Sequence, residues 1–367
     1  MKKKKKMRGG KKKFLLVLTT LIIAMSCASI ETNTEKSTGQ IFLYGEHHGS
    51  IRQQDKQLEI WSDYYHNQSM RHMFIEFPYF TAEFLNIWMQ SDNDDILYEF
   101  YNDWAADVPW IRTNLAFFRT IKCEFPETVF HGIDIGFSYW SAGARFLQHL
   151  KDNDMQGTER YLLTLKAIEQ GKHHEQSGFC HIFRVTSMAE NFIREFDRLG
   201  NQSVMGIFGN AHVILGYRAL GLPDIPTLAD RLRERYGDSS VHTTDVPQLI
   251  MQTDPIRVDI IYINDVNYEA SYFGTHLEMY RNIVAESFWR LENAYDDFSS
   301  RPTYNGWWRS FDTHPMVVEI NQVIMVDTTF ADGSIERMFF RSSAGEYMFG
   351  IPNGLPVTKR ICFSGED

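Results

Sequence analysis

The chain has 367 residues and a formal net charge of −10 at pH 7, and 43% of its residues are hydrophobic and 14% aromatic. A composition this rich in apolar and aromatic residues excludes an intrinsically disordered protein. The length leaves room for one large domain, or for a domain of about 200–250 residues with an appendage.

The first 27 residues have the layout of a secretory signal. Nine Lys and Arg residues precede an apolar run that begins at Phe14, and small residues surround Cys27. The run is too short to span a bilayer comfortably, so the segment predicts export, with an uncleaved anchor helix as the alternative. The cysteine after "IAMS" resembles the lipobox of bacterial lipoproteins. We therefore expect lipidation at Cys27 and a membrane-anchored lipoprotein of the bacterial cell envelope.

The residues after the signal segment change the charge balance. Removing the nine basic residues from the total of 37 leaves 28 against 47 acidic residues, a formal charge of −19. This predicts no nucleic-acid partner. Residues 28–39 are small and polar, as in a tether. The cysteines beyond Cys27 are Cys123, Cys180 and Cys362, an odd number without a CxxC pair, so neither a disulfide framework nor a cysteine zinc site is expected.

Alternating short apolar runs and longer amphipathic segments follow. The apolar runs, which are rich in β-forming residues, predict strands at 40–44, 72–77, 128–134 and 203–210. The amphipathic segments predict helices at 52–67, 81–90, 111–122, 139–152, 158–170, 181–199 and 212–220. This alternation predicts an α/β domain over residues 40–250, with a mostly parallel sheet flanked by helices.

The pattern changes after about residue 250. We expect a C-terminal appendage over residues 251–367, with a helical stretch around 276–297 followed by a small antiparallel β element. Asp332-Gly333 lies between two apolar runs of alternating residues, which predicts a hairpin.

Polar side chains follow four of the predicted strands. In a parallel sheet the carboxyl ends of the strands lie at one edge, where open α/β sheets bind ligands. Residues far apart in the sequence would then share one crevice. The side chains in question are Glu46, His47, His48, Glu76, Asp134, Asn210 and His212.

Two kinds of chemistry suit these residues. His48 could act as a general base held by Glu46 or Glu76. Alternatively, His48, Glu76 and His212 could bind a divalent metal, such as Mn, Co or Zn, which lowers the pKa of a bound water to about 7.

Each residue also has a structural interpretation. Glu46, Glu76 and Asp134 could cap helices, and His212 could be a structural histidine at a helix start. His47 is expected to point away from the crevice, since adjacent residues near a strand end face opposite sides. The pair His173-His174 is predicted to lie in a solvated loop.

Four motifs in order carry a family resemblance. They are "GEHHG" after the first strand, "FIE" after the second, Trp110-x-Arg112-x-Asn114 before "FHGID", and "GNAH". Over residues 40–220 this order resembles the EreA/ChaN-like superfamily, which includes erythromycin esterases, haem-binding ChaN proteins and TraB/Tiki proteases.

The resemblance implies three alternatives. An esterase would use His48 as the base, with Glu76 in support and His212 and Arg112 near the crevice. A Tiki-like protease would bind a metal through His48, Glu76 and His212. A ChaN-like protein would bind haem and have no catalytic activity. We predict a hydrolase of ester or peptide bonds that acts on a small-molecule or peptide substrate, with haem binding as the alternative. The oligomeric state is left open.

Overall fold

The computed structural model describes residues 39–104, 111–216, 225–277, 282–310, 313–344 and 356–362. The predicted signal segment, the lipidation site Cys27 and residues 28–38 of the predicted tether lie outside these ranges. Among the described residues, no helix combines the length and the apolar character that a membrane span requires.

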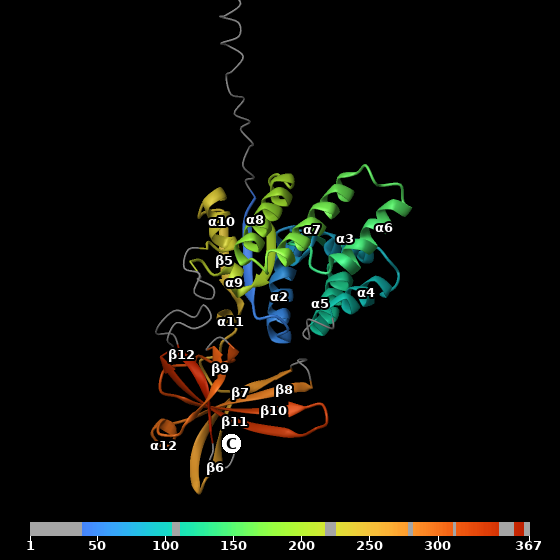
Figure 1. Ribbon diagram of the computed structural model, residues 1–367. Coiled ribbons are helices and arrows are strands. Elements are labelled where there is room, and N and C mark those ends of the chain that lie inside the picture. The colour runs from blue at the N-terminus through green and yellow to red at the C-terminus, as the bar shows by residue number, and fades with distance from the viewer. Residues whose placement is uncertain are drawn as a thin grey trace, which may run out of the picture. The chain divides into compact units, whose positions relative to one another are not determined.

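A five-stranded parallel sheet forms the centre of the first part of the chain (Figure 1). Its strand order is β3-β2-β4-β1-β5, and every pairing is parallel. The predicted α/β fold is therefore confirmed, although β5 was not predicted. The strands are β1 (Ile41–Glu46), β2 (His72–Pro78), β3 (Val129–Asp134), β4 (Val204–Gly209) and β5 (Val241–Asp245).

Helices cover both faces of this sheet. Those on one face are α2 (Ile51–Asn67), α3 (Tyr79–Met89), α4 (Asp95–Trp104) and α5 (Ile111–Glu124), whose apolar residues share one core. Those on the other face include α8 (His181–Arg198) and α10 (Leu228–Tyr236). The remaining helices are η1 (Tyr139–Gly143), α6 (Ala144–Asp152), α7 (Glu159–Gln176), α9 (Asn210–Val213) and α11 (Val246–Leu249).

Most predicted helices are confirmed, with three differences. The helices α4, α10 and the short α11 were not predicted. The helix expected at 212–220 is reduced to the short α9, and residues 217–220 lie outside the described ranges. The loop expected at His173-His174 was wrong, because α7 continues through it. Ile168, Gly171 and His174 are all buried at helical spacing, so this face of the helix packs into the domain.

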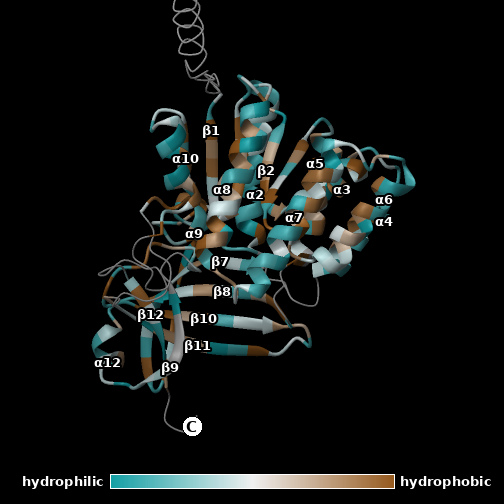
Figure 2. Cartoon of the chain, turned by 45° about the horizontal axis from the view of Figure 1, so that its top comes forward, coloured by the Kyte–Doolittle hydropathy of each residue, from teal (hydrophilic) through white to brown (hydrophobic). Residues whose placement is uncertain are grey.

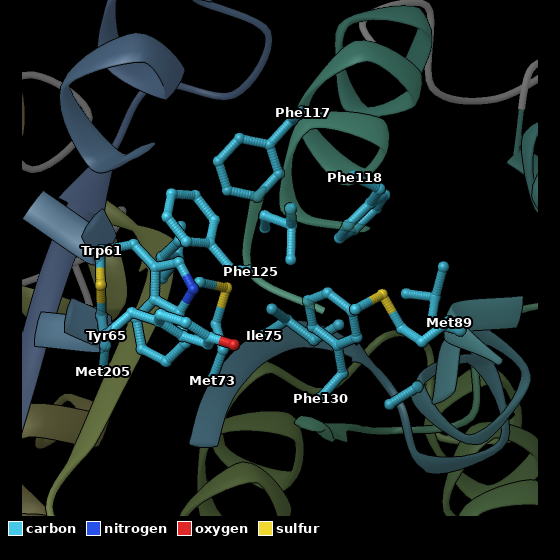
Figure 3. Close-up of a cluster of buried hydrophobic side chains, with 14 of the residues drawn as sticks. Trp61, Tyr65, Met73, Ile75, Met89, Phe117, Phe118, Phe125, Phe130 and Met205 are labelled. Atoms are coloured by element: carbon cyan, nitrogen blue, oxygen red, sulfur yellow. The ribbon is translucent and has the colours of Figure 1, made fainter. Parts of the chain in front are cut away.

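Two apolar cores hold the sheet between its helices. Figure 2 shows hydrophobic strands β1 and β2 between helices of mixed hydropathy. Figure 3 shows part of the core on the α2–α5 side, where Ile75 lies beside Phe130, whose ring packs edge-on against that of Phe118. Burial of each large apolar side chain is worth about 1.5–3 kcal/mol, so these cores fix where the strands end.

The C-terminal part is a seven-stranded antiparallel sheet with the order β6-β7-β8-β10-β11-β12-β9. The predicted hairpin at Asp332-Gly333 is confirmed between β10 and β11, with Gly333 at φ 83°. The strands are β6 (Arg257–Ile263), β7 (Val266–Leu277), β8 (Ile283–Leu291), β9 (Thr303–Ser310), β10 (Val323–Phe330), β11 (Ile335–Ala344) and β12 (Pro356–Ile361).

The helix expected around residues 276–297 was wrong. This segment contains the end of β7, the whole of β8 and part of the short helix α12 (Tyr295–Ser299). The strand β8 pairs with β7 on one side and with β10 on the other. Hydrogen bonding to two neighbouring strands outweighs the local helical preference of this segment.

Candidate active site

Four strand ends bring the predicted side chains together. Glu46 ends β1, Glu76 lies near the end of β2, Asp134 ends β3, and His212 lies in α9 directly after β4. The strands β1 and β4 are neighbours, with Glu46 beside Gly209. The residues therefore converge at one edge of the sheet, as expected from the parallel arrangement.

Glycines at two strand ends permit this close approach. A Cβ atom at Gly209 would lie 3.1 Å from Nε2 of His48, and one at Gly45 would lie 2.1 Å from Oδ1 of Asn210. The second contact is too short for any side chain at residue 45. The close approach of His48 and Asn210 at these positions thus explains the glycine that begins each of the motifs "GEHH" and "GNAH".

Glu76 is the centre of the cluster. Its Oε1 atom lies 3.2 Å from Nε2 of His212, and its Oε2 atom accepts a 2.6 Å hydrogen bond from the backbone N–H of Gly209. Nε2 of His48 lies 3.8 Å from the same Oε2 atom. The carboxylate of Glu76 thus contacts groups at the end of β4 and in α9 at hydrogen-bond distance, with His48 slightly farther away.

Arg184, on α8, lies between two of these carboxylates. Its Nη2 group donates to Oε1 of Glu76 at 2.6 Å and to Oδ2 of Asp134 at 2.7 Å, and its Nε group donates to Oδ1 of Asp134 at 3.1 Å. Asp134 is 2% exposed. Burial would lower the pKa of Arg184, but the charges of Asp134 and Glu76 raise it, so the guanidinium is a permanent cation.

His48 is oriented by Glu46. Its Nδ1 atom lies 2.8 Å from Oε1 of Glu46, whose Oε2 atom accepts a 2.6 Å hydrogen bond from Nε2 of Gln57. The side chain of His48 is 36% exposed. A carboxylate that fixes Nδ1 of a histidine sets the tautomer in which Nε2 can exchange a proton with substrate.

The charges of the site shift two pKa values in opposite directions. Burial would raise the pKa of Glu76, but His212, His48 and Arg184 hold it well below its usual range. Burial would lower the pKa of His48, but the hydrogen bond from its Nδ1 to Glu46 and the negative charges of Glu76 and Glu46 raise it to about 9. Opposite shifts of neighbouring groups are typical of functional sites.

The remaining predicted residues have different positions. His47 does not line the cavity beside Glu76, and its backbone N–H donates to Oε1 of Gln53 at 2.8 Å. Arg112 lies in α5, but its side chain lies outside the part of the chain that the structure describes.

Sequence reasoning missed Arg184 altogether. It lies on α8, which was predicted from sequence only as an amphipathic helix that covers the sheet. A signal was available, since two carboxylates at neighbouring strand ends, Glu76 and Asp134, cannot both be buried as anions without a cation. The arginines of the covering helices were the candidates.

A cavity of about 290 Å³ opens beside the cluster. Its polar wall contains Glu46, His48, Glu76, Asp134 and Arg184, and Asn114 also lines it. The rest of the lining forms an apolar wall that is mostly aromatic. Its residues are Ile75, Phe77, Trp104, Ile111, Phe117, Phe118, Phe137 and Ile207. Largely apolar pockets with a few convergent polar groups are typical of small-molecule sites.

His48 also lines a second cavity, of about 520 Å³. This cavity contains His47, Arg52 and Gln53 from the first part of the chain. It also contains Glu286 and Arg309 from the C-terminal sheet. His48 is therefore the residue that the two cavities share.

The predicted metal ligands do not fit a metal ion. His48 and His212 direct a ring nitrogen to Glu46 and Glu76, respectively, while both oxygens of Glu76 accept hydrogen bonds from Arg184 and Gly209. Among the described residues, no group of three or more His, Cys, Asp or Glu side chains is arranged to hold a metal ion. The cation of this cluster is Arg184.

No protein-family model matches the chain, and no curated protein matches it. Three solved structures are similar to it, each at 12% sequence identity. One is a protein from Bacillus cereus, with a TM-score of 0.39 over 56% of this chain and 65% of that protein. The chain thus spans less than two thirds of the length of that protein.

The second similar structure is a mutant of the erythromycin esterase EreC in its open conformation, with a TM-score of 0.40 over 57% of this chain and 69% of that one. The third is a succinoglycan biosynthesis protein, with a TM-score of 0.39 over 62% of this chain and 69% of that one. The chain is similar to an erythromycin esterase. The function proposed below rests on the side chains of the site.

Proposed function

We propose that the chain is a hydrolase that cleaves an ester or peptide bond, with water as the second reactant and His48 as the general base. The observation that carries this proposal is the 2.8 Å contact between Nδ1 of His48 and Glu46 at the wall of an aromatic cavity. A histidine oriented by a carboxylate beside a substrate-sized cavity is the arrangement that general-base catalysis requires.

In the proposed reaction His48 takes up one proton and later releases it. Neutral His48 takes a proton from water at Nε2 while the water oxygen attacks the carbonyl carbon. The resulting tetrahedral oxyanion expels the alcohol or amine, and the protonated His48 returns its proton to that leaving group. Glu46 stabilises the imidazolium during this cycle, and Gln57 keeps Glu46 in place.

Asn114 is a suitable donor to the oxyanion. Its Oδ1 atom accepts a 2.8 Å hydrogen bond from Nε2 of Gln54, which fixes the orientation of the amide. Within the described residues, no acceptor pairs with its amino group, and Asn114 lines the cavity beside His48. Amide donors fixed before reaction stabilise developing negative charge at little cost in reorganisation.

Arg184, Glu76 and Asp134 act as positioning residues in this proposal. Their charges are paired with each other at 2.6–3.1 Å, so they form a rigid wall behind His48. The negative charge of Glu76 also contributes to raising the pKa of His48, which makes the neutral imidazole a stronger base toward water.

The apolar wall selects the substrate. A cavity of about 290 Å³ with a mostly aromatic lining suits an apolar acyl group or an apolar peptide side chain. The second cavity, which His48 also lines, then provides room for the rest of a larger substrate.

The test is hydrolysis of a panel of 4-nitrophenyl esters and peptide 4-nitroanilides with small, alkyl and aromatic acyl groups. His48→Ala is expected to lower kcat by about 10²–10⁴-fold on every substrate that the wild type cleaves. His66→Ala, at an exposed histidine near the end of α2, serves as the matched control and should retain full activity. Equal rates for His48→Ala and wild type, with equal thermal midpoints, would overturn the proposal.

A further inference from the structure

The end strand of the C-terminal sheet has an exposed apolar row. β6 pairs only with β7 among the described strands, so its other edge is open (Figure 1). The row consists of alternate residues, which point to the same face of a strand. Their exposed fractions are 61% for Ile256, 49% for Val258, 67% for Ile260 and 64% for Tyr262. Edge strands normally carry charges or Pro at such positions to prevent pairing.

The backbone groups of Val258, Ile260 and Tyr262 face the open edge, whereas the backbone N–H of Ile256 donates to the carbonyl of Tyr272 on β7. Asn264 and Asp265 form the two-residue loop between β6 and β7, with φ angles of 49° and 65°. In such a hairpin the residues flanking the loop, here Ile263 and Val266, form a hydrogen-bonded pair. Hydrogen bonding alternates along an antiparallel strand, so Ile260 and Val258 direct their N–H and C=O groups away from β7.

We propose that β6 pairs antiparallel with β6 of a second copy of this chain, about a two-fold axis at Val258. The pairing joins the two C-terminal sheets into one. It places the apolar row of one copy beside the same row of the other, with Ile256 opposite Ile260 and Val258 opposite Val258. The backbone N–H and C=O groups of Val258 in one chain then bond to those of Val258 in the second chain.

The charges of β6 select this register. Arg257 and Asp259 flank Val258, point to the other face and are 2.9 Å apart within one strand. With the axis at Val258, each Arg257 lies opposite Asp259 of the second copy, which gives two symmetric ion pairs. These positions are the non-hydrogen-bonded pairs, where facing side chains are closest.

The neighbouring registers lack this complementarity. An axis at Asp259 would place the two Asp259 carboxylates opposite each other, and an axis at Arg257 would do the same for the two guanidinium groups. Like charges directly opposite each other destabilise a strand pair. An axis at Ile260 would leave Asp259 opposite the apolar Ile261.

Oligomeric state tests the surface. The full chain carrying Cys27→Ser, which removes the predicted lipid attachment, is measured by light scattering in detergent solution. We expect a dimer at micromolar concentration, and a monomer with an unchanged thermal midpoint for Val258→Lys. The matched control is Val284→Lys, at an exposed valine of the interior strand β8, which should remain dimeric. A monomeric parent chain, or a dimer that survives Val258→Lys, overturns the proposal.

Charge exchange and cross-linking test the register. Arg257→Asp should give a monomer, and the double variant Arg257→Asp/Asp259→Arg should restore the dimer. With Cys123→Ser as a further background change, Val258→Cys should form an intermolecular disulfide under mild oxidation. Ile260→Cys should not form one, because residue 260 of one chain faces residue 256 of the other, four residues from the second introduced cysteine. Equal cross-linking of both variants, or failure of the double variant to dimerise, overturns the assigned register.

Discussion

The guanidinium group of Arg184 lies 2.6 Å from a carboxylate oxygen of Glu76, although 108 residues separate them in the sequence. The same group bonds to Asp134, so one arginine from a covering helix neutralises two acids at neighbouring strand ends. The buried acidic cluster of this site therefore depends on α8.

Removal of this arginine should destabilise the fold strongly. Arg184→Met leaves the Glu76 and Asp134 carboxylates buried without their cation, which costs about 3–5 kcal/mol at neutral pH. Urea denaturation of wild type and variant measures the difference in the free energy of unfolding. Arg337→Met, which breaks an exposed ion pair with Asp327, is the control and should cost about 1 kcal/mol or less.

The pH dependence of this difference has a defined sign. In the wild type the pKa of Glu76 is held low, so its contribution to stability is present above the pKa of the unfolded chain and is lost as the pH falls through the folded pKa. In Arg184→Met that pKa rises, and the carboxylate can bind a proton in the folded state. The difference between variant and wild type should therefore shrink at about pH 4 relative to pH 7. A constant difference would contradict the ion-pair account.

The rate of hydrolysis should rise with pH into the alkaline range. The general base must be neutral, and the pKa of His48 is raised to about 9, so only about 1% of the base form is present at pH 7. We expect kcat/KM to increase up to about pH 9 and then level off. A profile that is already flat at pH 7 would exclude His48 as the titrating base.

Glu46→Gln should shift that profile. The neutral amide can no longer favour the imidazolium, so the apparent pKa of kcat/KM moves to lower pH. Its plateau falls because the ring loses its carboxylate partner. A merely structural Glu46 would change the plateau without moving the pKa. Glu59→Gln, on the exposed surface of α2, is the control and should move neither.

Chelation distinguishes the metal-free and metal-bound forms of the hydrolase. Because Arg184 supplies the cation at Glu76, prolonged treatment with a chelator should leave the rate unchanged. The predicted alternative, with Mn, Co or Zn at His48, Glu76 and His212, requires loss of activity and its return on addition of metal. Elemental analysis of protein purified without chelator provides the independent measurement.

Haem binding is tested by optical titration. A non-catalytic haem protein should shift the Soret band at a defined ratio of haem to protein. We expect no saturable shift, because the polar wall of the cavity is occupied by paired charges and its volume is about 290 Å³. A saturable shift that is lost in His48→Ala would support the haem-binding alternative.

The sequence predicted the parts of the site that follow strands. A strand end is visible in sequence as an apolar run that stops at a polar residue, which is how Glu46, His48, Glu76 and His212 were found. Arg184 was missed because its role depends on how α8 packs over the sheet. The strand β8 was mistaken for part of a helix because its pairing with β7 and with the distant β10, and not local periodicity, determines its structure.

The strand order β2-β4-β1 also fixes when the site can form. The two earliest strands, β1 and β2, are separated by the place that β4 fills, and β4 begins only at Val204. A chain emerging from the ribosome or crossing a membrane thus carries Glu46, His48 and Glu76 long before Gly209 and His212 can reach them. Activity should appear in one late step of assembly, when β4 inserts between β2 and β1 at the centre of the sheet.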